Sequence, residues 1–82
     1  MKEWALKWAQ GVILGFCRGS IELNRVIGML RRAEKYGVKS DELLSIIEVI
    51  EESPVYLPFM SNEEKRSKLK PLKEIFNKGD NK

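Results

Sequence analysis

Apolar residues recur every three or four positions along most of the chain, which is the period of helices that bury one face. This pattern predicts a first helix over about residues 2–17, a second over 20–36 and a third over 40–53. Ser40 stands at the start of the third helix as an N-cap, and Pro54 ends this helix. The first half of the chain therefore reads as three consecutive helices.

The C-terminal third continues the helical pattern after an apolar connector, PVYLPFM, at residues 54–60. Ser61 and Glu64 have the spacing of a capping box and open a fourth helix over about residues 62–70. Pro71 either kinks this helix or starts a fifth. The connector is expected to cover the core, with docking on a partner as the alternative.

Together these elements predict an all-α fold, a compact bundle of four to five short helices, the last over about residues 71–77. We expect a single helical domain over residues 1–76, followed by a polar, frayed tail at 77–82. A domain of this size buries only about 60–65% of the surface that its unfolded chain exposes. Association with another chain is the ordinary way for so small a domain to add buried area.

The first helix has apolar residues on two sides and only a narrow polar stripe. One of the two sides combines large rings with missing side chains, and consists of Trp4, Trp8, Gly11 and Gly15. A glycine inside a helix costs about 1 kcal/mol relative to alanine, so the shallow trough needs a reason. Either a neighbouring helix of the same chain packs there, or the trough is an interface for another copy or another protein. Gly19 lies just beyond the helix, and Ser20 is placed to cap the next one.

Charge is segregated into three blocks, although the formal net charge is only +3. Residues 1–39 and 65–82 each carry a net charge of +5, whereas residues 40–64 carry −7 and no basic residue. The acidic block either pairs with the basic blocks within the chain, or leaves a basic face free to meet an acidic partner such as nucleic acid.

The basic residues with the best placement for nucleic acid lie on the outward side of the second helix and near the C-terminus. The candidates are Arg25, Gly28, Arg31, Arg32, Lys35, Lys65, Arg66 and Lys68, with Lys70 and Lys73 as a possible extension. Gly28 lies among the arginines, where the absent side chain would let a phosphate backbone approach closely. The alternative is a solvated basic face that pairs with the acidic block.

A local pattern joins the second and third helices, AEKYGVKSDELLSII at residues 33–47. Ala33 is the small residue of the first helix, Gly37 is the turn glycine, and Tyr36 and Val38 flank it. Apolar residues follow on the second helix, at Leu43 and Ile46. Over about residues 30–49 this resembles the helix-turn-helix motif of DNA-binding proteins.

The resemblance implies that the third helix enters the major groove. Its exposed positions, however, are Ser40, Asp41, Glu42, Leu44, Ser45 and Glu48. Several carboxylates without a basic residue repel phosphate, so we expect contacts from the second helix instead.

Residue types that carry catalysis or bind metals are scarce. The chain has no histidine and a single cysteine, Cys17, so the sequence favours no enzyme, no metal site, no cofactor and no disulfide. The longest uncharged run has ten residues, from Trp8 to Cys17, whereas a membrane span needs about 20. We therefore expect no cleaved signal, no membrane span and a cytoplasmic location. The lack of threonine and histidine fits a thermophilic source.

These observations favour a small non-enzymatic protein that binds duplex nucleic acid, mainly through phosphate contacts from a basic helix face. The alternative is a protein-interaction module or homo-oligomer that uses the tryptophan and glycine side of the first helix. Peripheral membrane binding through the same tryptophan-rich helix ranks last, because its polar stripe is narrow and only weakly basic.

Overall fold

All the regular structure in the computed structural model is helical. The structure describes residues 2–80, with side chains for residues 2–77. Over this part of the chain it contains four helices and no strand: α1 (Lys2–Cys17), α2 (Leu23–Lys35), α3 (Ser40–Glu52) and α4 (Asn62–Asp80). The predicted all-α bundle is confirmed, and the first helix begins and ends where the pattern placed it.

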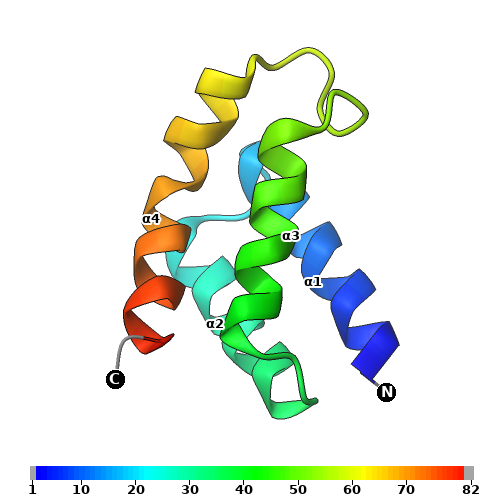
Figure 1. The fold of residues 1–82 in the computed structure, drawn as a ribbon, viewed down its shortest axis with the longest axis vertical. Coiled ribbons are helices and arrows are strands. Elements are labelled where there is room, and N and C mark those ends of the chain that lie inside the picture. The colour runs from blue at the N-terminus through cyan, green and yellow to red at the C-terminus, as the bar shows by residue number, and fades with distance from the viewer. Residues whose placement is uncertain (1, 81–82) are drawn as a thin grey trace.

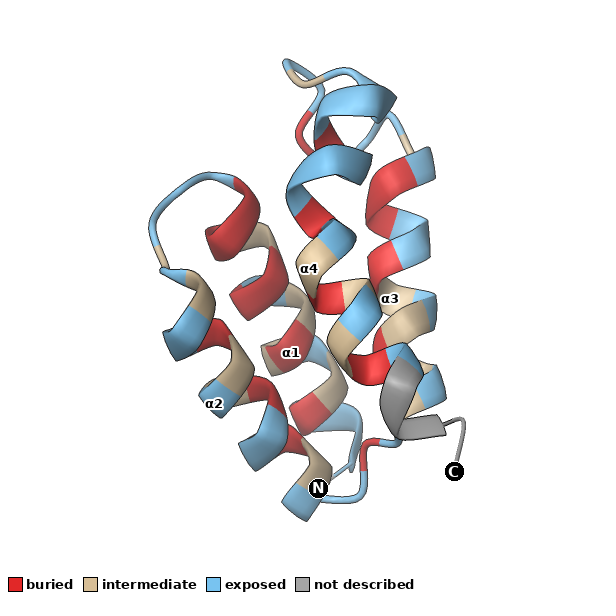
Figure 2. Cartoon of the chain, turned by 90° about the vertical axis from the view of Figure 1, so that its left-hand side faces the viewer, coloured by how far each residue is buried: buried red, intermediate tan, exposed pale blue. Residues whose placement is uncertain are grey.

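Successive helices run in alternating directions, so the start of α1, the α2–α3 turn and the end of α4 lie at one end of the molecule (Figure 1). The most extensive packing is between α3 and α4 and between α1 and α2, while α1 also contacts α3 and α4. Figure 2 shows that the buried positions of the helices face the interior. The structure is therefore two helical hairpins packed together through α1.

The core draws apolar side chains from all four of these helices, from the α2–α3 turn and from the connector after α3. Its members are Ala5, Ala9, Val12, Ile13, Phe16, Cys17, Val26, Leu30, Ala33, Val38, Leu43, Ile47, Ile50, Leu57, Leu69, Leu72 and Phe76. Most of them lie on the apolar faces read from the sequence, because burial of such side chains is the main contribution to stability.

The junction between α1 and α2 differs from the prediction. Gly19 has a left-handed backbone, with φ of +84°, and the N–H of Ser20 donates to the carbonyl of Gly15 at 2.9 Å. This 6→1 hydrogen bond closes the end of α1. Ser20 therefore belongs to the first helix terminus and does not cap the second, which begins later, at Leu23, with Glu22 as its N-cap.

The start of α3 is also one residue from the predicted cap. Lys39 is the N-cap, and its N–H donates to the Glu42 carboxylate at 2.8 Å. Ser40 lies inside the helix, where its hydroxyl donates to Glu34 at 3.1 Å. The hydrogen bond from Lys39, together with the Lys2 ammonium at 2.9 Å, holds the pKa of Glu42 below its usual value.

The predicted capping box at the start of α4 is present. The N–H of Glu64 donates to the Ser61 hydroxyl at 3.0 Å, and the N–H of Ser61 donates to the Glu64 carboxylate at 2.8 Å. Two of the free N–H groups at this helix terminus are thereby satisfied by reciprocal bonds.

The expected fourth and fifth helices are one continuous helix with Pro71 inside it. Proline lacks the N–H that would bond to the carbonyl four residues earlier, that of Ser67. Because Ser67 lies on the exposed side of α4, this loss falls where solvent is close. The helix continues to Asp80, beyond the predicted end of the last helix at about residue 77; residues 81 and 82 of the expected tail lie outside the described residues.

The connector between α3 and α4 covers the core with only part of its apolar sequence. Leu57 is buried although its backbone is left-handed, with φ of +55°, and Tyr56 and Met60 are partly buried. Val55 and Phe59 are 78% and 75% exposed, so the expectation that they also cover the core was wrong. The connector therefore covers the core through Leu57, with Tyr56 and Met60 packed partly against it.

Candidate nucleic-acid interface

The exposed side of α2 carries basic residues at the spacing of a single helix face. We call Arg25, Gly28, Arg32 and Lys35 the α2 basic face; all four are exposed. Their separations of three, four and three residues place them on one stripe of the helix. The apolar residues Val26, Leu30 and Ala33 hold the opposite side of α2 in the core.

A shallow hollow lies at the centre of the α2 basic face. It has a volume of about 420 Å³ and is lined by Asn24, Arg25, Gly28, Met29 and Arg32. A Cβ atom built at Gly28 would meet nothing within 4 Å, so the space above the helix backbone is open. Two of the lining residues are arginines, whose guanidinium groups hydrogen-bond phosphate well.

The acidic residue within α2 is turned away from this face. Glu34 accepts hydrogen bonds from the Ser40 hydroxyl at 3.1 Å and from the Arg31 guanidinium at 3.4 Å. The Glu34 carboxylate is thus bound at the junction with α3. No carboxylate interrupts the stripe from Arg25 to Lys35.

Arg31 belongs to a different side of the helix from the other arginines. Its guanidinium carbon lies 5.1 Å from the centre of the Phe76 ring on α4. Together with its bond to Glu34, this contact directs Arg31 across the boundary between α2 and α4. Of the predicted cluster on the second helix, the structure therefore brings together Arg25, Gly28, Arg32 and Lys35, with Arg31 beside them.

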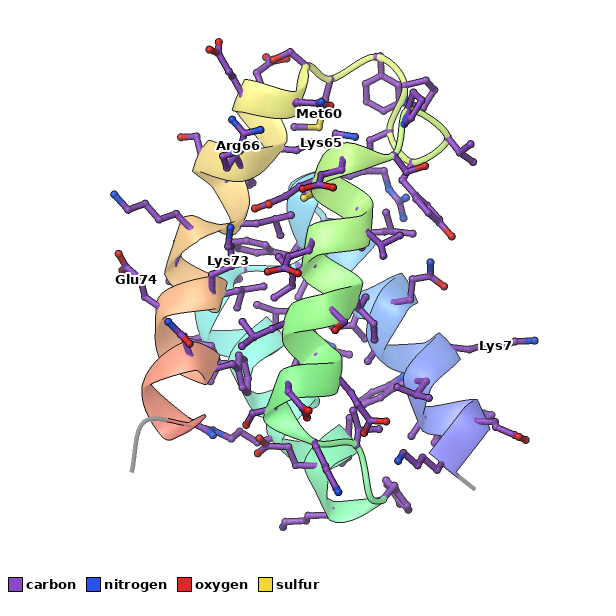
Figure 3. The ribbon with its side chains drawn as sticks, viewed as in Figure 1. Lys7, Met60, Lys65, Arg66, Lys73 and Glu74 are labelled. Carbon is purple, nitrogen blue, oxygen red and sulfur yellow. The ribbon has the colours of Figure 1, made fainter. Side chains whose placement is uncertain are left out.

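Lys65, predicted to contact nucleic acid, is fully buried. Its Nζ atom donates to the carbonyls of Ser53 and Tyr56, each at 3.0 Å, at the end of α3 and in the connector (Figure 3). The prediction for this residue was wrong, because these carbonyls supply acceptors that allow a lysine to enter the interior.

The other basic residues of α4 do not form one patch. Lys68 lies over the ring of Phe16, 5.2 Å from its centre, on the side of α4 that meets α1. Arg66 lines a separate hollow with Lys70 and Lys73, and Lys73 donates to the buried carboxylate of Glu51 at 3.2 Å. The predicted continuous surface from α2 through Arg66 and Lys68 is therefore divided.

Two aromatic residues of α1 and the C-cap residue of α2 form a second feature, which we call the aromatic cluster: Trp4, Trp8 and Tyr36. The rings of Trp4 and Trp8 are stacked, with centres 6.0 Å apart and planes 6° apart. Tyr36 meets Trp4 edge to face, with ring centres 5.9 Å apart. Trp4 remains 56% exposed, and Trp8 is partly buried.

The glycine trough predicted beside the tryptophans is half filled by the chain itself. A Cβ atom at Gly15 would lie only 2.9 Å from Cδ1 of Ile21, so the missing side chain makes room for the α1–α2 junction. A Cβ atom at Gly11 would meet nothing within 4 Å. Packing within the chain thus explains Gly15, whereas Trp4 and Gly11 remain accessible to solvent.

The aromatic cluster and the α2 basic face adjoin each other. Tyr36 is the C-cap of α2, one helical turn beyond Arg32, and it touches Trp4 on α1. The sequence pattern placed Tyr36 only at the turn and did not indicate that it belongs to this surface. Its position four residues after Arg32 was the available signal.

The residues of the helix-turn-helix resemblance lie at the junction of α2 and α3. Ala33, Val38 and Leu43 are buried, and Gly37 has the left-handed φ of +98°. The outward side of α3 carries Asp41, Ser45 and Glu48, all exposed. The motif itself stays a prediction.

The remaining reactive group, the Cys17 thiol, is buried. Desolvation raises its pKa above the usual value, although the nearby Lys68 and Lys65 ammonium groups oppose the shift. Over the described residues, no group of three or more histidine, cysteine or acidic side chains is arranged to hold a metal ion. Within residues 2–80, no helix combines the length and apolar character required to cross a bilayer.

No protein-family model, curated protein or solved structure matches this chain.

Proposed function

We propose that this protein binds nucleic acid through phosphate contacts from the α2 basic face. The observation that carries the proposal is the stripe of Arg25, Arg32 and Lys35 around the open backbone at Gly28, with the acidic side chain of α2 turned away. Phosphate contacts of this kind supply affinity without reading sequence. The acidic outer side of α3 disfavours a groove-reading role for that helix.

The test is a titration of labelled nucleic acid with the full-length protein at several salt concentrations. We expect binding at about 50 mM salt that weakens steeply towards about 200 mM, because each phosphate contact releases counterions. Reversing two charges, Arg25→Glu with Arg32→Glu, should weaken binding at least about tenfold and reduce the magnitude of the salt slope by about two.

A matched control separates the proposed face from overall charge. Arg66→Glu with Lys70→Glu changes the net charge by the same amount, at the separate hollow on α4. We expect this variant to bind within about threefold of the parent protein, because only long-range screened charge is altered. Equal losses in both variants would contradict the assignment to α2, and the absence of binding at about 50 mM salt would contradict the function.

Self-association is the second candidate, and the exposure of Trp4 beside the open backbone at Gly11 favours it. Because Gly15 is filled by Ile21, a contact through the predicted trough would use only its Trp4 and Gly11 portion. Light scattering across a wide concentration range tests this candidate: a constant mass of 9.5 kDa would exclude it.

A further inference from the structure

The aromatic cluster presents a large ring to solvent at the end of the molecule where α1 begins. Trp4 is more than half exposed, yet the stacked ring of Trp8 and the perpendicular ring of Tyr36 hold it in a defined orientation. A ring that is both exposed and fixed is suited to stacking on another flat group, since little side-chain freedom is lost on contact.

The charges beside the cluster indicate what kind of flat group fits. Arg25, Met29, Arg32 and Tyr36 follow each other at intervals of four, three and four residues, so they form one stripe along α2. Tyr36, the last of them, touches Trp4. A ligand that lies along this stripe therefore meets guanidinium groups first and an aromatic platform at its end.

Phosphates joined to flat bases match this order of groups, provided that the bases are unpaired. In a duplex the bases are stacked on one another, and only their edges are accessible in the grooves. In a single strand each base has a free face, and proteins bind it by combining a basic track with aromatic side chains.

From this juxtaposition we propose that the aromatic cluster stacks on an unpaired base, with Trp4 as the contact, so that the preferred ligand is single-stranded nucleic acid. The proposal rests on the proposed function, because the α2 basic face supplies the phosphate contacts. It adds the class of nucleic acid and the residue that selects it.

The chain offers a direct probe of this contact. Trp4 and Trp8 are its only tryptophans, so intrinsic fluorescence reports on the aromatic cluster alone. We would titrate the full-length protein with oligothymidylate, and in parallel with a mixed-sequence duplex of equal length. Tryptophan emission and the anisotropy of labelled nucleic acid would be followed together.

We expect the single strand to quench the emission and to bind more tightly than the duplex. Trp4→Ala should weaken single-strand binding by about five- to 150-fold, the range for loss of one stacked base, and should leave duplex binding within about twofold. Trp4→Phe should retain most of the affinity, because it keeps a ring. Circular dichroism would verify that both variants are folded, as expected for a residue that is mostly exposed.

Different failures identify different errors. If binding depends on Arg25 and Arg32 but the duplex binds as tightly as the single strand, or if Trp4→Ala weakens both equally, only the stacking proposal is overturned. If neither nucleic acid binds, the proposed function fails and this inference with it. Emission that changes with protein concentration, and not with added oligonucleotide, would assign Trp4 to contact between copies of the chain and overturn the proposal.

Discussion

The fully buried Lys65 leads to the sharpest prediction about stability. Its ammonium group donates to the carbonyls of Ser53 and Tyr56 at 3.0 Å each, and so ties α4 to the end of α3 and to the connector. Lys65→Met keeps the length and most of the apolar volume of the side chain but removes the charge and both hydrogen bonds.

The magnitude follows from two opposing terms. A hydrogen bond from a charged donor contributes about 1.5–3 kcal/mol, so the two bonds together contribute about 3–6 kcal/mol. Removing a buried ammonium regains part of its desolvation cost, which we expect to offset about a third of that loss. The free energy of unfolding should therefore fall by about 2–4 kcal/mol, a large share of the 5–15 kcal/mol typical of a domain.

The assay is urea unfolding followed by far-ultraviolet circular dichroism. Lys70→Met is the matched control, because it makes the same chemical change on an exposed residue of the same helix. We expect the control to change stability by less than about 0.5 kcal/mol. If Lys65→Met is as stable as Lys70→Met, the two carbonyl contacts do not hold the connector and the reasoning fails.

Three further predictions concern α1 and the start of α3. Gly11→Ala should raise the free energy of unfolding by about 1 kcal/mol, measured by the same urea titration, because the site is helical and open; a loss of stability would show that something packs there. Cys17 should react with a thiol reagent far more slowly in the folded protein than in urea, because burial shields the thiol and raises its pKa; equal rates would contradict this. The pKa of Glu42 is lowered in the folded state by the N–H of Lys39 and then by Lys2, so its stabilisation is complete above the unfolded pKa and is lost as the pH falls through the lower folded pKa. Glu42→Gln should flatten this acid-side decline in urea unfolding measured at several pH values, and an unchanged decline would assign it to other carboxylates.

The helices were predictable wherever local sequence decides the outcome. The apolar period located α1 to the residue, and the capping box at Ser61 and Glu64 is present as read. Predictions failed where the bounds of a helix depend on contacts between residues distant in sequence, or on which helix a backbone N–H group bonds to. The N–H of Ser20 bonds to the end of α1. Pro71 is tolerated inside α4 because the carbonyl that loses its hydrogen bond, that of Ser67, lies on the exposed side of the helix.

Part of the candidate site was also predictable, because local sequence decides which residues of α2 are exposed. Exposure of Arg25, Gly28 and Arg32 follows from the helical period of α2. The burial of Lys65 and the contact of Tyr36 with Trp4 both depend on how helices meet, which one sequence does not state. The basic surface and the aromatic surface were predicted as alternative binding sites. The way α1 and α2 pack places them side by side.

The pairing of each helix with its neighbour in the chain has a consequence for how the molecule forms. Because α1 packs mainly on α2 and α3 mainly on α4, most native contacts close short loops. Chains with such local topology reach their native state within microseconds to milliseconds. The α1–α2 hairpin can form before α3 and α4 have been synthesised, and the short turn at Gly37 then brings the two halves together.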